Sequence, residues 1–253
     1  MTQDDTRLAH PGDIAAGFVL LSRLPVRASD AALARGAAAA WSWPLVGAVL
    51  GGLAGLAAML LLGLGLPAPL AAGVSLGLLA MMTGAMHEDG LADTVDGFWG
   101  GWTVPRRLEI MKDSHIGSYG VIALVLSLGL RWMALSLLCE AGLALPALIA
   151  AGALSRAVMP SLMHGLPPAR ESGLSHSVGR VSFDTAVLAG ALGAVLALLA
   201  LGLAALPLIA VVALTGWGVA GLARAKIGGQ TGDVLGAAQQ LAEIAALLAL
   251  TAL

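Results

Sequence analysis

Apolar residues run along this chain in long stretches, separated by short polar segments. A helix needs about 20 apolar residues to cross the hydrocarbon core of a bilayer, and seven stretches come close to that length. They cover residues 44–64, 67–86, 120–138, 143–163, 185–205, 207–223 and 234–253. A shorter apolar stretch from Ile14 is cut off by Arg23 and Pro25, which predicts a short interfacial or re-entrant helix. We therefore expect an all-α, polytopic membrane bundle of about seven transmembrane helices, forming a single domain over residues 1–253.

Composition supports a membrane protein. Hydrophobic residues make up 58% of the chain and charged residues only 11%, against roughly a quarter charged in an average soluble domain. Gly47, Gly51 and Gly55 recur at four-residue spacing, which predicts a close helix–helix contact face. One cysteine excludes an intrachain disulfide framework and a cysteine-rich metal site. The net charge of −2 gives no reason to expect nucleic acid as a partner.

The basic residues indicate the orientation of the bundle. With seven spans, the segments 1–43, 87–119, 165–184 and 224–233 fall on one side, and they hold eleven of the thirteen Lys and Arg residues. The other two, Arg131 and Arg156, lie inside predicted spans. Because Lys and Arg accumulate in cytoplasmic loops, we expect a bacterial cytoplasmic (inner) membrane protein whose long loops, and any active site, face the cytoplasm.

Acidic residues are concentrated in the segment 87–119. It holds six of the fifteen Asp and Glu residues, namely Glu88, Asp89, Asp93, Asp96, Glu109 and Asp113. If a helix continues through this segment, Asp89, Asp93 and Asp96 share one face while Glu88 points about 100° away. Three carboxylates on one stripe call for a cation, and their oxygen ligands suit Mg²⁺ or Mn²⁺. A solvated acidic loop would explain the charge but not the shared face.

A glycine-rich segment, "GGQTGDVLGA" at 228–237, precedes the last predicted span. Backbone N–H groups in such a turn, followed by a helix N-terminus, bind phosphate. Gly228, Gly229 and Thr231 are therefore candidate phosphate ligands, and Asp233 is a candidate metal ligand. The segment lacks the GK[ST] ending of a Walker loop, and a simple interhelical turn is the alternative.

Charged residues within spans need a specific reason, because each costs at least ~3 kcal/mol on insertion scales. For Arg156 we expect a cavity-facing phosphate ligand rather than a structural ion pair. For Arg131 we expect a structural pair with Glu243. The segment "RRLEIMKDSHIGSYG" at 106–120 offers Lys112 and Asp113 for a phosphate and its metal, although ordinary flanking charge explains its arginines equally well.

Five motifs taken together resemble the cobalamin 5′-phosphate synthase family, the adenosylcobinamide-GDP ribazoletransferases. They are "SRLPV" (22–26), "HEDGLADTVDG" (87–97), "EIMKDSHIGSYG" (109–120), "PPARESGL" (167–174) and "GGQTGDVLGA" (228–237). They occur in the family's order and cover nearly the whole chain. His115 departs from the family pattern, which has arginine there, and this puts one phosphate contact in doubt. The pattern leaves the roles of His87 and His115 open.

The resemblance implies a membrane phosphotransferase acting at the last joining step of cobalamin biosynthesis. Such an enzyme joins adenosylcobinamide-GDP to α-ribazole, or to α-ribazole 5′-phosphate, and releases GMP. Together with the residue patterns, the resemblance implies a catalytic domain that binds one or two Mg²⁺ ions, with Mn²⁺ as an alternative. It also implies a role for each of the following site residues. The metal ligands would be Asp89, Asp93, Asp96 and Asp233; the proton acceptor Asp96 or Asp113; the phosphate-binding cations Arg156, Lys112, Arg170 and Arg23. We expect membrane lipid as a further partner, and assembly into a homo-oligomer is left open.

Two other classes of function compete with this interpretation. "DTVDG" looks like the D-x-x-D-G core of CDP-alcohol phosphotransferases, so a CDP-alcohol-type or prenyl transferase is the nearest alternative. Charged residues and broken helices also serve cation-coupled transporters. A transporter should place its acids near the bilayer midplane, whereas these acids lie at span ends.

Overall fold

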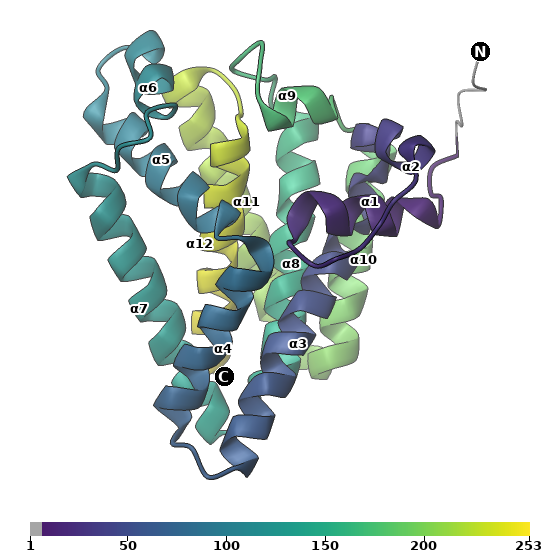
Figure 1. The fold of residues 1–253 in the computed structure, drawn as a ribbon, viewed down its shortest axis with the longest axis vertical. Coiled ribbons are helices and arrows are strands. Elements are labelled where there is room, and N and C mark those ends of the chain that lie inside the picture. Colours follow the sequence, from purple (N-terminus) through teal and green to yellow (C-terminus); the bar gives the residue numbers. More distant parts are fainter. Residues whose placement is uncertain (1–6) are drawn as a thin grey trace.

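The computed structural model describes residues 7–253, and these residues form a bundle of helices (Figure 1). In chain order the helices are α1 (Gly12–Leu21), α2 (Asp30–Ala34), the 3₁₀ helix η1 (Gly36–Ser42), α3 (Trp43–Gly63), α4 (Ala68–Thr83), α5 (Met86–Gly100), α6 (Val104–Ile110), α7 (Ser118–Glu140), α8 (Ala144–Gly165), α9 (Leu174–Val178), α10 (Phe183–Leu201), the 3₁₀ helix η2 (Gly202–Ala204), α11 (Ala205–Ile227) and α12 (Gly232–Thr251). Extended pairing within the described part of the chain is limited to one isolated bridge, between Pro168 and Gln230. The all-α prediction is confirmed.

The long helices are apolar enough to make this a multi-pass membrane protein. By length and hydropathy, five helical segments of residues 7–253 qualify as spans, or six if the bent pair α4 and α5 forms one. One of the five, Phe183–Ile227, contains both α10 and α11, joined by η2. The ring of Phe183, at one end of this segment, packs against His164 of α8, and Arg224, near its other end, donates to the carbonyl of Gly165, so the segment folds back on itself. A helix therefore occupies each of the seven predicted stretches. Helix α1, with 10 residues, is too short to span, as the sequence predicted.

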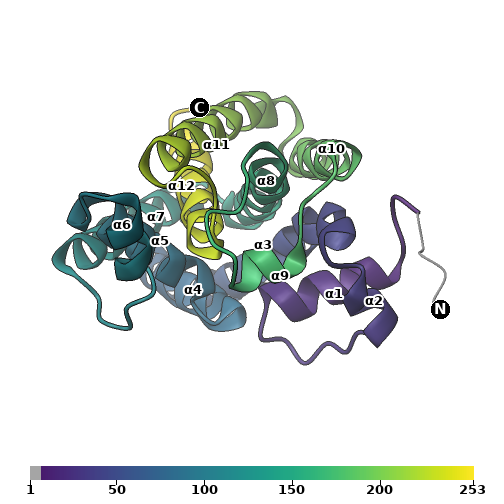
Figure 2. The ribbon, with the colours of Figure 1, turned by 90° about the horizontal axis from the view of Figure 1, so that it is seen from above.

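Helix α8 runs through the middle of the bundle, with α3, α10 and α12 packed around it (Figure 2). Small residues allow its backbone to approach α3 closely. Gly47, Gly51 and Gly55 of α3 all face α8, and a Cβ on Gly55 would meet the Cα of Leu145 at 2.7 Å. Such contacts replace the hydrophobic effect as the source of helix association inside a membrane. The predicted glycine face is thus confirmed.

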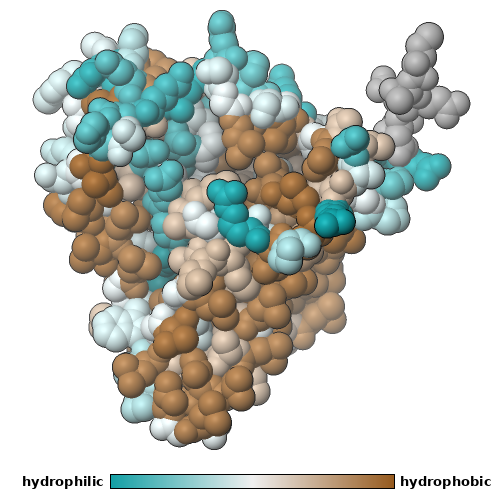
Figure 3. Space-filling model, in the orientation of Figure 1, coloured by the Kyte–Doolittle hydropathy of each residue, from teal (hydrophilic) through white to brown (hydrophobic). Residues whose placement is uncertain are grey.

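Polar residues gather at one end of the bundle, around α6 and α9, while the other end is apolar over the face shown (Figure 3). Three connecting segments meet at the polar end. Arg170, between α8 and α9, donates to the carbonyl of Leu108 in α6 at 3.1 Å. The N–H of Ala169 donates to the carbonyl of Gln230, and the N–H of Gln230 donates to the carbonyl of Pro167, so these two bonds tie the same segment to the turn before α12. These contacts build the region in which the predicted site residues lie.

Candidate active site

The acidic helix α5 begins at a sharp break in the chain. Helix α4 ends at Gly84, with φ 66°, and the next residue, Ala85, has φ 54°. Left-handed residues end helices, and here two in succession turn α5 by 87° relative to α4. The sequence argument considered Asp89–Gly97 as a continuation of the preceding helix, whereas α5 is a separate helix with its own direction. The helical stripe of acids that the spacing predicts is nevertheless present, because α5 stays helical from Met86 to Gly100.

Glycines bring α5 against the start of α12. A Cβ on Gly90 would meet the carbonyl oxygen of Asp233 at 2.8 Å, and a Cβ on Gly236 would meet the Cα of His87 at 3.2 Å. The two backbones are therefore in contact, with no room for side chains between them. This contact places Asp89 and Asp93 in the same region as Asp233, although 140 or more residues separate them in the chain.

The carboxylates differ in burial and in their partners. Asp89 is exposed, Asp93 is half-buried and Asp96 is buried. Asp93 lies within electrostatic reach of Asp89, Asp96 and Asp233, and also of the Arg170 guanidinium. Within residues 7–253, the side chains of Asp89 and Asp93 have no hydrogen-bond or ion-pair partner, so their oxygens are free to bind a ligand.

Asp96 has a different environment. Its two carboxylate oxygens accept hydrogen bonds from the backbone N–H groups of Gly117, at 2.7 Å, and Gly120, at 2.9 Å. These groups belong to the first turn of α7, where N–H groups lack partners within the helix. A Cβ on either glycine would collide with the Asp96 carboxylate. Asp96 therefore fastens the start of α7 to α5, which corrects the expectation that it is a free proton acceptor.

Asp233 lies at the N-terminus of α12 and is held by two neighbours. Thr231 caps this helix by accepting from the N–H of Val234 at 3.3 Å, and its hydroxyl also contacts Asp233 Oδ2 at 3.2 Å. Arg170 donates to the same oxygen at 3.1 Å. The guanidinium and the positive end of α12 thus lie beside one another, which favours an anion at this position.

Gly228 and Gly229 shape the turn before α12. Gly228, with φ 75°, ends α11, and its N–H bonds to the carbonyl of Arg224. Gly229 lies against the backbone of Pro167 and Ala169, where a Cβ would collide. Gly228 thus provides the left-handed turn and Gly229 the close backbone approach, and the phosphate contacts expected of them remain a prediction. Thr231 and Asp233, by contrast, line a cavity.

That cavity has a volume of about 220 Å³ and lies between α5, α8, α9 and the start of α12. Its polar lining includes Asp89, Arg170, Thr231 and Asp233. Trp43, Met159 and Met163 are among its apolar lining residues. Of the predicted site residues, the structure brings these four polar ones together at the cavity, with Asp93 beside them.

Three other predicted residues lie away from the cavity. Lys112 and Asp113 are exposed on the connection between α6 and α7. The Asp113 carboxylate accepts a hydrogen bond from His115 at 2.7 Å, which lowers the pKa of Asp113 below its usual value. Arg23 packs against Gly84 at the break between α4 and α5 and lines a neighbouring pocket. The structure gives none of the three a place in the cavity wall.

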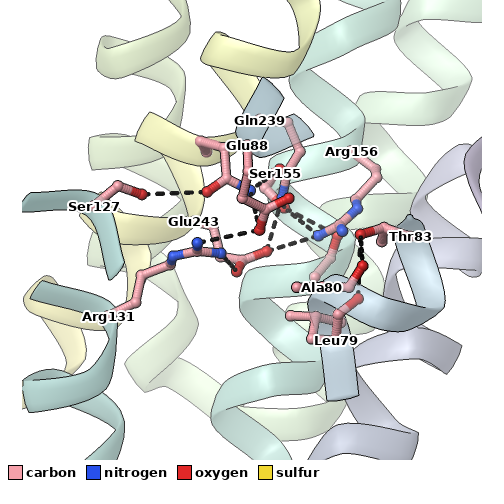
Figure 4. Close-up of polar contacts among 12 residues, drawn as sticks. Leu79, Ala80, Thr83, Glu88, Ser127, Arg131, Ser155, Arg156, Gln239 and Glu243 are labelled. Atoms are coloured by element: carbon pink, nitrogen blue, oxygen red, sulfur yellow. Dashed lines mark hydrogen bonds and ion pairs between the residues drawn. The ribbon is translucent and has the colours of Figure 1, made fainter. Parts of the chain in front are cut away.

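Arg156 and Arg131 belong to a buried network (Figure 4). Glu243 on α12 bridges them, with its Oε2 accepting from Arg156 at 2.7 Å and its Oε1 from Arg131 at 3.2 Å. Arg131 also donates to Glu88 at 3.1 Å. The predicted Arg131–Glu243 pair is confirmed. The expectation that Arg156 is a cavity-facing phosphate ligand is wrong, because its guanidinium pairs with Glu243 and does not line the cavity. A buried arginine needs such a carboxylate partner to offset its loss of hydration.

Carboxylates from α5 and α12 approach one another without forming a complete metal cage. Within residues 7–253, no group of three or more His, Cys, Asp or Glu side chains stands close enough to hold a metal ion by itself. An oxygen-rich site that is open in this way leaves coordination positions for a ligand that brings its own oxygens.

Sequence reasoning missed several residues that build this site. Gly236, Gly117 and Gly120 are needed where another backbone or a carboxylate approaches closely. Ser175 and Gln230, which hydrogen-bond to each other and line the cavity, join α9 to the turn before α12. The i, i+4 and i+7 spacing of the acids in "HEDGLADTVDG" was the available signal on α5. The family resemblance grouped Asp233 with these acids, but no spacing along the chain pairs α5 with α12.

The comparisons with known proteins agree over nearly the whole chain. The model of the family described as cobalamin-5-phosphate synthase matches residues 13–251. An adenosylcobinamide-GDP ribazoletransferase from Brucella canis is 46% identical, over 94% of this chain and 96% of that protein. A protein of the same name from Bradyrhizobium diazoefficiens is 47% identical, over 93% of this chain and 90% of its own. No solved structure matches. The chain therefore belongs to the cobalamin-5-phosphate synthase family.

Proposed function

We propose that this protein is an adenosylcobinamide-GDP ribazoletransferase. It joins adenosylcobinamide-GDP to α-ribazole, or to α-ribazole 5′-phosphate, and yields adenosylcobalamin, or its 5′-phosphate, and GMP. Family membership supports the substrates, since relatives that match more than nine-tenths of the chain carry this name. One structural observation supports the reaction type: carboxylates of α5 and α12 meet an arginine and a helix N-terminus at one cavity.

The reaction is a phosphoryl transfer between two anionic partners. A ribose hydroxyl oxygen of the ribazole forms a bond to the corrinoid-side phosphorus of the pyrophosphate. The bond between that phosphorus and the oxygen of the departing GMP breaks, and the hydroxyl proton passes to a base. Positive charge must offset the negative charge of the pyrophosphate before the hydroxyl can approach.

The residues present suit a divalent metal bound together with substrate. Mg²⁺ is usually held by one or two carboxylates plus substrate phosphates, and Asp89, Asp93 and Asp233 offer hard oxygens from two helices. Mn²⁺ suits the same ligands. When bound, the ion would neutralise charge on the pyrophosphate and on the leaving GMP. Asp96 would support the metal site without binding the ion, because it fixes α5 against α7 by accepting two backbone hydrogen bonds.

The protein's own cations and dipoles would orient the pyrophosphate. Arg170 lies in the cavity wall and still has a buried Nε without a partner in the described chain. Thr231 and Asp233 begin α12, whose N-terminus attracts negative charge. Asp89 and Asp93 have free carboxylate oxygens near the cavity, so one of them can accept the hydroxyl proton once the substrate is bound.

The site would face the cytoplasm of a bacterial inner membrane. Eleven of thirteen basic residues lie in the four segments that we expect on one side, and three of these segments meet at the polar end of the bundle. Cytoplasmic loops carry such an excess of Lys and Arg. A cytoplasmic opening would give access to soluble GDP-linked and ribazole substrates, while lipid surrounds the apolar end.

The test is release of GMP by the purified protein in proteoliposomes. We expect GMP from adenosylcobinamide-GDP when α-ribazole 5′-phosphate is added, and none when the acceptor is left out. A CDP-alcohol with a lipid acceptor should give no product. Product from the CDP-alcohol pair alone would contradict the proposal.

A further inference from the structure

A buried imidazole without a partner borders the cavity. His87 is 1% exposed and lines the cavity, and neither of its ring nitrogens has a hydrogen-bond partner within residues 7–253. Leaving a buried polar group without a hydrogen bond is destabilising, so such a group calls for an explanation. Arg156, Glu243 and Arg131 lie within electrostatic reach of the ring, but none of them hydrogen-bonds to it. Neither the phosphoryl transfer nor the buried network uses this side chain.

The cavity wall is polar in one part and apolar in another. Asp89, Arg170 and Asp233 mark the part where the pyrophosphate would react. The apolar part of the wall includes Leu20, Leu21, Trp43, Met159, Met163 and Leu235. His87 lies two residues before Asp89 on α5. It is also close to Arg156, which lies three residues before Met159 on α8. It therefore borders the apolar part from the side of the buried network.

We propose that the apolar part of this cavity binds the aromatic base of the ribazole, and that His87 hydrogen-bonds to the unsubstituted ring nitrogen of that base. The inference rests on the proposed function. A benzimidazole attached to ribose through one nitrogen is an apolar fused ring with a single remaining acceptor. Trp and Met side chains make favourable contacts with aromatic rings. An imidazole offers at least one N–H donor in either protonation state, so it matches that acceptor.

The other aromatic and ring systems of the reaction fit this wall less well. Guanine carries several donors and acceptors, most of which would lose their hydrogen bonds against leucine, methionine and tryptophan. The corrin ring is the largest of the three ring systems, and a cavity of about 220 Å³ suits the small fused ring of the base better. The base of the ribazole is the apolar, single-acceptor group among the three.

His87 would thus determine specificity and would not touch the reacting atoms. Because the hydroxyl must reach the corrinoid-side phosphorus beside Asp89 and Asp233, the base of the same nucleoside would extend from there into the apolar part. A site built to hydrogen-bond one substrate atom discriminates against an analogue that lacks it. The size of that discrimination is the measurable consequence.

The test compares two acceptors that differ in one ring atom. One is α-ribazole 5′-phosphate, and the other is its indole isostere, in which a C–H replaces the acceptor nitrogen. For the wild type, we expect kcat/KM for GMP release to be at least about tenfold higher with the benzimidazole, the factor that a hydrogen bond of ordinary net strength provides. His87→Leu and His87→Phe remove the donor and should reduce the preference to below about threefold. His164→Gln, which changes a histidine outside the cavity, should keep the wild-type preference.

Several outcomes would overturn the inference. A wild type that uses both acceptors equally contradicts it without any variant. A preference of wild-type size in either apolar His87 variant that inserts and folds also contradicts it, since the donor would then be elsewhere. If the wild type releases no GMP with α-ribazole 5′-phosphate, the proposed function itself is wrong. That result is distinct, because it appears before the two acceptors are compared.

Discussion

Gly90 of α5 lies directly against Asp233 of α12. A Cβ on Gly90 would meet the Asp233 carbonyl oxygen at 2.8 Å and the Asp233 Cα at 3.1 Å. This contact fixes how closely the acids of α5 approach the N-terminus of α12. The site thus depends on a position that has no side chain, as well as on the carboxylates beside it.

Alanine at position 90 should reduce turnover while the protein still folds. The added methyl group must push α5 and α12 apart, and misplacement of catalytic groups by about 1 Å can cost about 100-fold in rate. We expect Gly90→Ala to lose activity to this extent in the GMP-release assay. Gly77→Ala on α4 is the matched control, because a Cβ there meets nothing within 4 Å. Equal activity of the two variants would show that the close contact is unimportant.

The buried network should contribute to stability in a definite order. Glu243 bridges Arg156 and Arg131, so Glu243→Ala removes a partner from both, whereas Glu88→Ala leaves Arg131 with Glu243. Breaking a buried ion pair costs about 3–5 kcal/mol. Thermal unfolding in detergent should therefore show the largest loss for Glu243→Ala, a smaller one for Glu88→Ala, and almost none for exposed Glu140→Ala. A loss for Glu88→Ala that equals or exceeds that of Glu243→Ala would refute this order.

Hydropathy predicted most of the fold because helix length and apolarity are local properties. Each of the seven stretches became a helix, and the glycine spacing of α3 correctly indicated a contact face. The break between α4 and α5 was not predicted. Gly84 alone is an ordinary helix end, but the left-handed Ala85 that follows it depends on packing that the sequence does not display.

The site was predicted only in part, because residue spacing is a local property of one helix, whereas contacts between helices are not. Spacing on one helix placed Asp89, Asp93 and Asp96 on a common stripe, and helical geometry correctly separated Glu88 from them. Spacing could not show that Asp96 is bonded to the first turn of α7, or that Glu243 faces two arginines. Partners across helices depend on tertiary packing, so Arg156 was assigned to the cavity when its partner lies in the core.

Asp113 should be dispensable for catalysis. It is exposed and does not line the cavity, and its carboxylate is bonded to His115. The lowered pKa of Asp113 means that the group is ionised at neutral and mildly acidic pH, and His115→Ala should let this pKa rise toward its usual value. We expect Asp113→Asn to keep turnover within about threefold of wild type, as for most surface substitutions, with an unchanged pH–rate profile. Loss of one limb of that profile would instead identify Asp113 as the base.

The orientation in the membrane can be measured with single cysteines. In a Cys139→Ala background, Lys112→Cys marks the connection between α6 and α7, and Ala141→Cys marks the turn between α7 and α8; both positions are exposed. Because basic loops stay in the cytoplasm, an impermeant thiol reagent added to intact cells should label position 141 and spare position 112. Labelling of position 112 from outside would reverse the proposed orientation.

The central claim is that Asp89, Asp93 and Asp233 act through a divalent metal on the pyrophosphate. It is tested most directly by GMP release over a Mg²⁺ titration, measured for Asp89→Asn, Asp93→Asn and Asp233→Asn beside Glu109→Gln. Glu109 is an exposed acid on the neighbouring helix α6, paired only with Arg106 within the described chain, so it controls for loss of negative charge. We predict that EDTA abolishes wild-type activity, that each Asp variant loses at least ~100-fold in turnover or needs more Mg²⁺ for half-maximal rate, and that Glu109→Gln behaves as wild type. Full activity in EDTA, or wild-type turnover and Mg²⁺ dependence in Asp93→Asn, would contradict the account.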